Sequence, residues 1–218
     1  MVDLRGAVAV ATVVAALTVT GCGDSSRVSN SSCADVAKPK PHASGSHHAP
    51  NAELDVAKRW TLTFRTSCGS FTVQLAPQTS PHATASLVAL ARSGFFDGTI
   101  FHRIVPGFVI QGGDPTQTGR GGPGYTTVDT PATGTQYAKG VVAMGKTAVE
   151  PRGTAASQFF VMTAAAPSLA PDYAVVGRVV SGLDVVERIG ELGDPNDPNG
   201  TPTKTVVIDE VVVGVTGP

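Results

Sequence analysis

The 218-residue sequence contains no G-x-S-x-G, H-E-x-x-H or C-x-x-C motif. These motifs carry the nucleophile of many hydrolases, the zinc ligands of metalloproteases and the reactive thiols of redox proteins. The usual components of hydrolytic and redox chemistry are therefore missing. The sequence also lacks clustered lysine and arginine, and its formal net charge is -1. Because a surface that binds phosphates requires clustered positive charge, we expect no nucleic-acid partner.

The N-terminus contains the apolar run AVAVATVVAALTVT, residues 7–20. A run of this length is too short to span a bilayer comfortably and is typical of an export signal, so we predict a signal peptide over residues 1–21. The letters VTGC that end this region resemble a bacterial lipobox, which would make Cys22 the lipidated first residue of a protein anchored to the outside of the cell membrane. The alternative is an ordinary secretory peptide with an incidental cysteine.

Only three cysteines are present. If Cys22 carries lipid, Cys33 and Cys68 remain as an even pair in an oxidising compartment, where disulfides persist. A disulfide between them is one hypothesis and two free thiols are the other, because the sequence does not give their separation in space.

Residues 22–58 are rich in serine, proline and histidine and show neither helix nor strand periodicity. This composition predicts a flexible tether. His42, His47 and His48 lie within it and could gather a metal ion, but no partner ligands flank them at a fixed spacing. We therefore interpret them as part of a solvated linker and predict no metal site.

Alternating apolar residues begin at Trp60 and continue on both sides of the turn letters SCGS, which predicts a β-hairpin with one buried face. The Ser-Pro start of SPHATASLVALARSGFF and its stop at Gly94 predict a helix, and LDVVERIGEL predicts a second. Between and after these lie the short apolar runs VVAM, QFFVM, AVVGRVV and TVVIDEVVVGV. Many short strands with two helices predict a mainly β domain over residues 59–218, a closed or nearly closed antiparallel barrel with helices at its ends.

Two motifs suggest other functions. GVVAMGKT, residues 140–147, satisfies the nucleotide-binding pattern G-x-x-x-x-G-K-[ST]. Such a loop must lead into a helix that faces the phosphates, yet Pro151 and Gly153 follow, so we exclude it; a helix over residues 147–156 would restore it. GDPNDPNG is similar to a calcium loop, but Pro198 takes the place of an oxygen ligand, and we predict a surface turn.

Four stretches in order resemble the cyclophilins, the peptidyl-prolyl cis-trans isomerases: GFFDGTIFHRIVPGFVIQGGDP, GRGGPGY, SQFFVMTA and LAPDYAVVGRVVSGLDVVERI. The resemblance covers residues 60–213. It implies a closed eight-stranded antiparallel barrel capped by two helices. It also implies an enzyme that rotates X-Pro bonds of proline-containing polypeptides and needs neither metal nor organic cofactor.

The resemblance also explains the absence of a nucleophile, since rotation about an X-Pro bond breaks no covalent bond. The obstacle is amide resonance, a barrier of roughly 18–20 kcal/mol. In the twisted transition state the prolyl nitrogen regains a lone pair, so a donor aimed at it binds the transition state better than the planar ground state. An arginine remains protonated and is suited to this role.

The resemblance assigns catalysis to Arg103, Phe108 and Gln111, and His102 to a structural role. Its substrate-binding residues would be Met144, Gln158, Phe160, Leu169 and Tyr173.

The sequence departs from the family in three places. Ser168 stands where many members carry a tryptophan, so we do not expect tight cyclosporin binding, and Tyr173 replaces a common histidine. The stretch from Met144 to Ser157 is three residues longer than in short members, with residues 145–147 as candidates for backbone contacts.

The expected protein is a monomeric isomerase that assists the folding of exported polypeptides and touches the membrane only through its lipid. The alternative is a proline-peptide-binding or chaperone module with weak catalysis.

Overall fold

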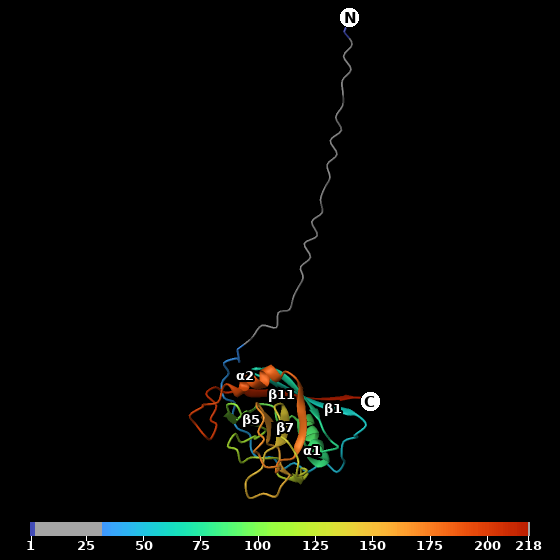
Figure 1. The fold of residues 1–218 in the computed structure, drawn as a ribbon, viewed down its shortest axis with the longest axis vertical. Helices are drawn as coiled ribbons and strands as arrows, with labels where there is room; N and C mark the ends of the chain where they lie inside the picture. The colour runs from blue at the N-terminus through green and yellow to red at the C-terminus, as the bar shows by residue number, and fades with distance from the viewer. Residues whose placement is uncertain (3–31, 218) are drawn as a thin grey trace. The chain divides into compact units, whose positions relative to one another are not determined.

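The computed structural model describes residues 1–2 and 32–217 (Figure 1). Cys22 and nearly all of the predicted signal peptide lie outside the described residues. Within the described ranges, no helix combines the length and the apolar character needed to cross a membrane.

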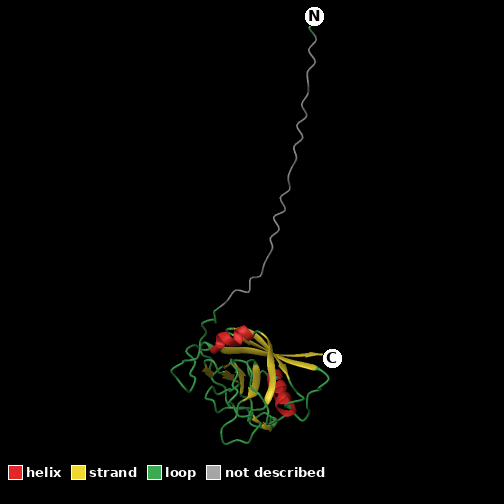
Figure 2. Cartoon of the chain, in the orientation of Figure 1, coloured by secondary structure: helices red, strands yellow, loops and turns green. Residues whose placement is uncertain are grey.

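Nine antiparallel strands form one sheet in the order β3-β11-β1-β2-β10-β7-β9-β5-β4. The strands, yellow in Figure 2, curve around the interior of the domain. A separate two-stranded sheet pairs β6 (Thr127–Val128) with β8 (Thr154–Ala155). The strands of the large sheet are β1 (Arg59–Thr66), β2 (Gly69–Leu75), β3 (Thr99–Ile100), β4 (Arg103–Val105), β5 (Val109–Gly112), β7 (Val141–Met144), β9 (Phe159–Met162), β10 (Val175–Ser181) and β11 (Val207–Thr216).

The sheet is open, so the prediction of a closed eight-stranded barrel was wrong. The run of chain over residues 99–105 divides into two strands, and each pairs with a different neighbour. Its first part, β3, pairs with β11, whereas its second part, β4, pairs with β5. Phe101 and His102 lie between the two and belong to neither strand. This interruption leaves β3 and β4 as the two ends of the sheet.

The predicted hairpin is confirmed as β1 and β2, which pair from Thr61 opposite Gln74 to Thr66 opposite Gly69. Each strand buries every second residue because successive side chains point to opposite faces. All six apolar residues of the predicted pattern are buried: Trp60, Leu62, Phe64, Phe71, Val73 and Leu75.

Both predicted helices are present, α1 over Pro81–Arg92 and α2 over Leu183–Gly190. Pro81 begins α1, where a missing backbone N–H costs nothing. The Ser80 side chain makes no capping hydrogen bond; the buried Asp129 accepts one from the Ala83 amide instead, at 2.7 Å. A carboxylate at this end of the helix also interacts favourably with the helix dipole.

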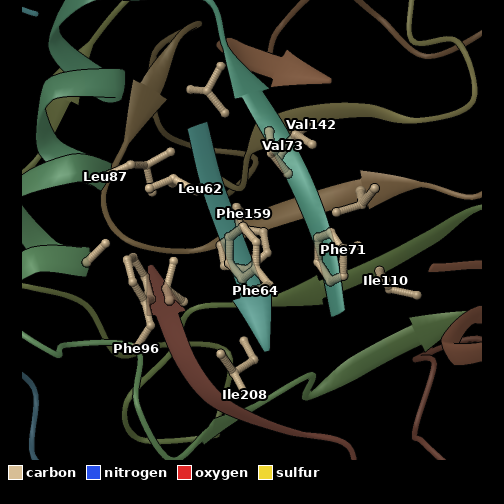
Figure 3. Close-up of a cluster of buried hydrophobic side chains, with 14 of the residues drawn as sticks. Leu62, Phe64, Phe71, Val73, Leu87, Phe96, Ile110, Val142, Phe159 and Ile208 are labelled. Atoms are coloured by element: carbon tan, nitrogen blue, oxygen red, sulfur yellow. The ribbon is translucent and has the colours of Figure 1, made fainter. Parts of the chain in front are cut away.

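The main core lies inside the curve of the sheet, both helices contribute side chains to it, and aromatic rings fill its centre (Figure 3). Phe64 stacks on Phe71 with ring centroids 4.8 Å apart, and Phe159 packs 5.0 Å from Phe64. Leu87 reaches the same cluster from α1. Burying each such side chain stabilises the fold by about 1.5–3 kcal/mol relative to leaving it exposed.

Residues 33–47, which we call the N-terminal arm, contain neither helix nor strand but are attached to the domain. A disulfide joins Cys33 to Cys68, in the turn between β1 and β2. Further along the arm, the amides of His42 and Gly45 donate hydrogen bonds to the backbone of the domain. The sequence predicted a flexible tether over residues 22–58. The arm, which is part of that stretch, differs from the prediction because a disulfide and hydrogen bonds attach it to the domain.

Candidate active site

A cavity of about 360 Å³ opens beside β4, β5 and β9. This volume lies within the range usual for small-ligand pockets, about 300–1,000 Å³. Six of the eight catalytic and substrate-binding residues predicted from the sequence line it. The lining residues are Arg103, Phe108, Val109, Gln111, Gly145, Lys146, Phe160, Leu169 and Tyr173.

Strand register brings three of these side chains together. Arg103 in β4 pairs with Gln111 in β5, and Gln111 pairs with Phe160 in β9. Residues directly opposite one another in an antiparallel sheet project to the same face. The consecutive strands β4 and β5 and the more distant β9 therefore place a cation, an amide and an aromatic ring in one row across the sheet.

Phe108 enters the cavity from the turn between β4 and β5. The Phe108 amide donates to the carbonyl oxygen of Val105 at 3.0 Å, and Gly107 has φ of +68°. Pro106 and Gly107 suit the central positions of such a turn, because proline fixes a negative φ and glycine accepts a positive one. The turn thus directs Phe108 back beside Arg103.

A chain of hydrogen bonds leads away from the arginine. Arg103 Nη1 donates to Gln111 Oε1 at 3.4 Å, Gln111 Nε2 donates to Gln158 Oε1 at 3.1 Å, and Gln158 Nε2 donates to the carbonyl oxygen of Gly121 at 3.1 Å. Among the described residues, Gln111 is the only side-chain partner of Arg103. The remaining guanidinium donors are free to bind a molecule in the cavity.

The loop segment that precedes Gly121 is held in place by the buried carboxylate of Asp114. This carboxylate accepts hydrogen bonds from the amides of Thr116, Thr118, Gly119 and Arg120, at 2.7, 3.0, 2.5 and 3.0 Å, and from the Thr116 hydroxyl at 2.8 Å. Burial raises the pKa of Asp114, but these hydrogen bonds outweigh it and leave the pKa below its usual value. Asp114 therefore remains charged at neutral pH and fixes the loop.

An aromatic cluster forms the apolar wall of the cavity. Phe160 lies 5.3 Å from Tyr173 and 6.4 Å from Tyr137, measured between ring centroids. The Tyr137 hydroxyl donates to the carbonyl oxygen of Tyr173 at 2.9 Å and accepts from the Tyr173 amide at 3.0 Å. Burial raises the pKa of Tyr137, so this hydroxyl keeps its proton. Tyr137 thereby fixes the backbone of a residue that lines the cavity.

Two residues predicted for the site lie elsewhere. Met144 is fully buried and belongs to the main core. The reason is its register: Met144 pairs with Phe159, which faces the core, whereas its neighbour Ala143 pairs with Phe160, which lines the cavity. Gln158 lines a second hollow of about 160 Å³ that shares Gln111 with the cavity.

Sequence reasoning missed two contributors to the cavity. Val109 lies at its wall beside Phe108. The side chain of Lys146 also lines it, with Nζ 5.6 Å from the centroid of the Tyr173 ring. Only backbone contacts were predicted for residues 145–147. Nothing in the sequence separates the orientation of Lys146 from that of an ordinary solvated lysine.

His102 is partly exposed, but both of its ring nitrogens are buried. Burial lowers its pKa, the nearby Asp114 raises it, and Arg103 lowers it again, with a net decrease. Neither ring nitrogen of His102 has a hydrogen-bond partner among the described residues. His102 does not line the cavity, and its structural role stays a prediction.

The rival nucleotide-binding motif does not form a phosphate-binding site. Met144 ends a strand, residues 147–150 form a turn, and Thr154–Ala155 is the strand β8. The helix that a P-loop requires over residues 147–156 is absent from this described stretch, because Thr147 and Glu150 close a local turn instead.

Comparisons with known proteins agree with this geometry. A family model described as cyclophilin type peptidyl-prolyl cis-trans isomerase/CLD matches residues 61–213. The chain is 36% identical over 143 residues to peptidyl-prolyl cis-trans isomerase CYP18-2 of Arabidopsis thaliana. The aligned region covers 62% of this chain and 83% of that protein. It is 36% identical over 171 residues to peptidyl-prolyl cis-trans isomerase A of Mycobacterium tuberculosis, which covers 70% of this chain and 91% of that protein.

Similar solved structures also belong to cyclophilin type peptidyl-prolyl cis-trans isomerases. A cyclophilin type peptidyl-prolyl cis-trans isomerase of Cryptosporidium parvum superposes with a TM-score of 0.65 at 28% identity, covering 73% of this chain and 99% of that chain. A crystal structure of that protein in the presence of the dipeptide Ala-Pro gives 0.64 at 29% identity, with 71% and 98% covered. Sequence motifs, fold and cavity thus converge, and the chain belongs to the cyclophilin-type peptidyl-prolyl cis-trans isomerases.

Proposed function

We propose that this isomerase acts on X-Pro bonds of exported polypeptides outside the cytoplasm, with Arg103 as the catalytic donor. The observation that carries the assignment of Arg103 is a guanidinium that lines an aromatic cavity and whose only side-chain partner among the described residues is Gln111. A proline ring would occupy the apolar part, against Phe108 and Phe160. The structural neighbour crystallised in the presence of Ala-Pro supports a proline-containing ligand.

The mechanism needs no proton transfer. In the planar amide the prolyl nitrogen shares its lone pair with the carbonyl group, and in the twisted transition state the lone pair returns to nitrogen. A guanidinium N–H directed at that nitrogen stabilises the transition state selectively, which raises kcat. Gln111 holds the guanidinium through its side-chain oxygen and is itself held by Gln158, to which its side-chain nitrogen donates.

A comparison of Arg103→Ala with the unchanged protein tests this role, using the rate of cis-to-trans conversion of a short proline peptide. We expect kcat/KM to fall at least about a hundredfold, since a lost transition-state hydrogen bond commonly costs that much. Arg178→Ala, at an exposed position of β10, is the matched control and should retain full activity.

The alternative, a binding or chaperone module with weak catalysis, predicts a different outcome. In that case Arg103→Ala would still suppress aggregation of a refolding client as well as the unchanged protein does. Equal isomerisation rates in the two proteins would refute the assignment of Arg103.

The proposed location rests on the sequence before residue 23 and is supported by the disulfide between Cys33 and Cys68, a bond that persists in oxidising compartments. Mass spectrometry of the mature N-terminus tests it. A diacylglyceryl group on Cys22, lost in Cys22→Ser, is the expected result. An unmodified chain released into the medium would contradict the proposed anchor.

A further inference from the structure

The N-terminal arm precedes the residues matched by the family model, 61–213, yet it is fixed to the domain at its start. Cys33 is joined to Cys68 by the disulfide. The Ala34 amide donates to the carbonyl oxygen of Ser67 at 2.8 Å, and Lys204 Nζ donates to the carbonyl oxygen of Cys33 at 2.9 Å. One covalent bond and two hydrogen bonds therefore hold one end of the arm.

The other end of the arm binds the 114–123 loop. Three arm amides donate to carbonyl oxygens of this loop: His42 to Pro115 at 2.8 Å, Gly45 to Gly122 at 3.0 Å and His47 to Pro123 at 2.8 Å. Earlier in the arm, the carbonyl oxygen of Pro39 accepts a hydrogen bond from Gln117 Nε2 at 3.1 Å. The arm and the loop thus run together like neighbouring strands, although neither is in a sheet.

Gly124 marks how closely they approach. A Cβ atom at this position would lie 2.5 Å from the carbonyl oxygen of Gly45 and 3.3 Å from the Cα of Ser46. The missing side chain is therefore what allows the arm backbone to lie against the loop.

The 114–123 loop leads directly to the catalytic cavity. The carboxylate of its first residue, Asp114, accepts hydrogen bonds from the loop amides, and the carbonyl oxygen of Gly121 accepts one from Gln158. Gln158 in turn holds Gln111, which holds Arg103. Continuous contacts therefore connect the disulfide, the arm, the loop and the guanidinium.

From these contacts we infer that the N-terminal arm is a positioning element of the isomerase site, and that the Cys33–Cys68 disulfide determines how firmly it acts. Opening the disulfide removes the covalent attachment at the start of the arm, so the arm detaches more often and the loop loses its partner. Gln158 and Gln111 then hold Arg103 less well. The inference rests on the proposed role of Arg103, and it makes the activity of the enzyme sensitive to reducing conditions.

The first experiment compares the unchanged full chain with the double variant Cys33→Ser, Cys68→Ser. Hydrogen exchange should accelerate at the amides of His42, Gly45 and His47, and next at those of residues 116–120. We expect kcat to fall about three- to tenfold with KM changed less than twofold, since couplings of this kind are modest. A matched control is Val211→Ala in β11, which destabilises the core but alters neither the disulfide nor the hydrogen bonds of the arm, and it should leave kcat unchanged at a temperature where both variants are folded.

The second experiment loosens the other end of the arm with the disulfide intact. Gly124→Ala should release the arm and lower kcat by a similar factor. Gly140→Ala controls for backbone strain, because φ is positive at both glycines, +97° at Gly124 and +81° at Gly140, but a Cβ at Gly140 would meet only ordinary contacts. It should leave both kcat and the exchange of the arm unchanged.

The outcomes separate this inference from the proposed function. Unchanged kcat in both arm variants, with accelerated exchange in the arm, would overturn the inference while leaving the isomerase role intact. Unchanged exchange of the 116–120 amides would overturn it as well. If Arg103→Ala were fully active, the proposed role of Arg103 would fail, but the exchange data would still report whether the arm stabilises the loop.

Discussion

Gln111 lies directly opposite Arg103 in the ladder between β4 and β5, and its side-chain oxygen accepts a hydrogen bond from Arg103 Nη1 at 3.4 Å. The same amide group donates to Gln158. The orientation of the amide is therefore fixed from both sides, and the oxygen is directed at the guanidinium.

This relationship predicts the effect of replacing Gln111. Gln111→Ala should lower kcat/KM about tenfold, because the guanidinium loses its orienting acceptor. Gln111→Glu should be at least as harmful, since a carboxylate would draw guanidinium donors away from the substrate. The measurement is the isomerisation rate of a proline peptide, with Gln136→Ala, at an exposed position, as the control. Full activity of Gln111→Glu would argue against a donor role for Arg103.

Asp114 is expected to be important for stability. Asp114→Asn places an amide group where the loop presents backbone donors, so some donors lose their acceptor. We expect the free energy of unfolding to fall by about 2–4 kcal/mol at neutral pH. Urea denaturation followed by fluorescence measures it. Asp209→Asn, an exposed residue of β11, should change stability by less than about 0.5 kcal/mol.

The lowered pKa of His102 predicts sensitivity to acid. The usual value is 6.5, and the folded protein resists protonation of the ring chiefly because the ring is buried. Between that pH and the lower folded pKa the unfolded state binds more protons, so the free energy of unfolding decreases as the pH falls. Unfolding curves from pH 7.5 to 5 should show this decrease.

The His102→Gln variant should flatten that profile, whereas the exposed His48→Gln should not. Asp114 acts in a separate window, because its lowered pKa contributes stability above its usual value of 3.8 that is lost as the pH falls through the folded pKa. An identical slope between pH 7 and 5 in His102→Gln and the unchanged protein would show that another group titrates there.

Tyr137 should affect both stability and catalysis without touching the cavity. Tyr137→Phe keeps the ring but removes the hydroxyl that binds the amide and carbonyl of Tyr173. Leaving these groups unpaired should cost about 1–3 kcal/mol in the free energy of unfolding. Because Tyr173 lines the cavity, we also expect a higher KM. Thermal denaturation and steady-state kinetics measure the two effects, and an unchanged KM would mean that Tyr173 keeps its position without this anchor.

The parts of the fold that could be predicted are those in which side-chain pattern determines structure. The hairpin was visible because one face is buried and the other is not, as the alternation from Leu62 to Phe64 illustrates. Phe108 and Phe160 could be assigned to the cavity because they lie within motifs of the cyclophilin family, and the structure places both there.

Met144 could not be placed in the same way. It ends a run of apolar residues in β7 that pairs with another such run in β9, where all four residues are buried. A strand that is buried on both faces has no alternation, so its sequence does not show which side chains face the core and which the cavity.

The attachment of the N-terminal arm to the domain could not be predicted from the sequence for a different reason. Its contacts with the 114–123 loop are mainly backbone hydrogen bonds, such as that from Gly45 to Gly122, and these are available to almost any sequence. Composition therefore indicated a tether, although the chain is laid along the domain. The break between β3 and β4 at Phe101 and His102 could not be predicted either, because the apolar content of a strand does not show which strand it pairs with.

The open end of the sheet has one further consequence for the arginine. Arg103 belongs to β4, which is the last strand and has a ladder partner on one side only, β5. The other edge of β4 is covered by the loop that follows α2, where the Ile104 amide donates to the carbonyl oxygen of Gly200 at 2.8 Å. The strand that carries the guanidinium is thus held along both edges although the sheet is open, which suits a donor that has to keep its position while the imide turns.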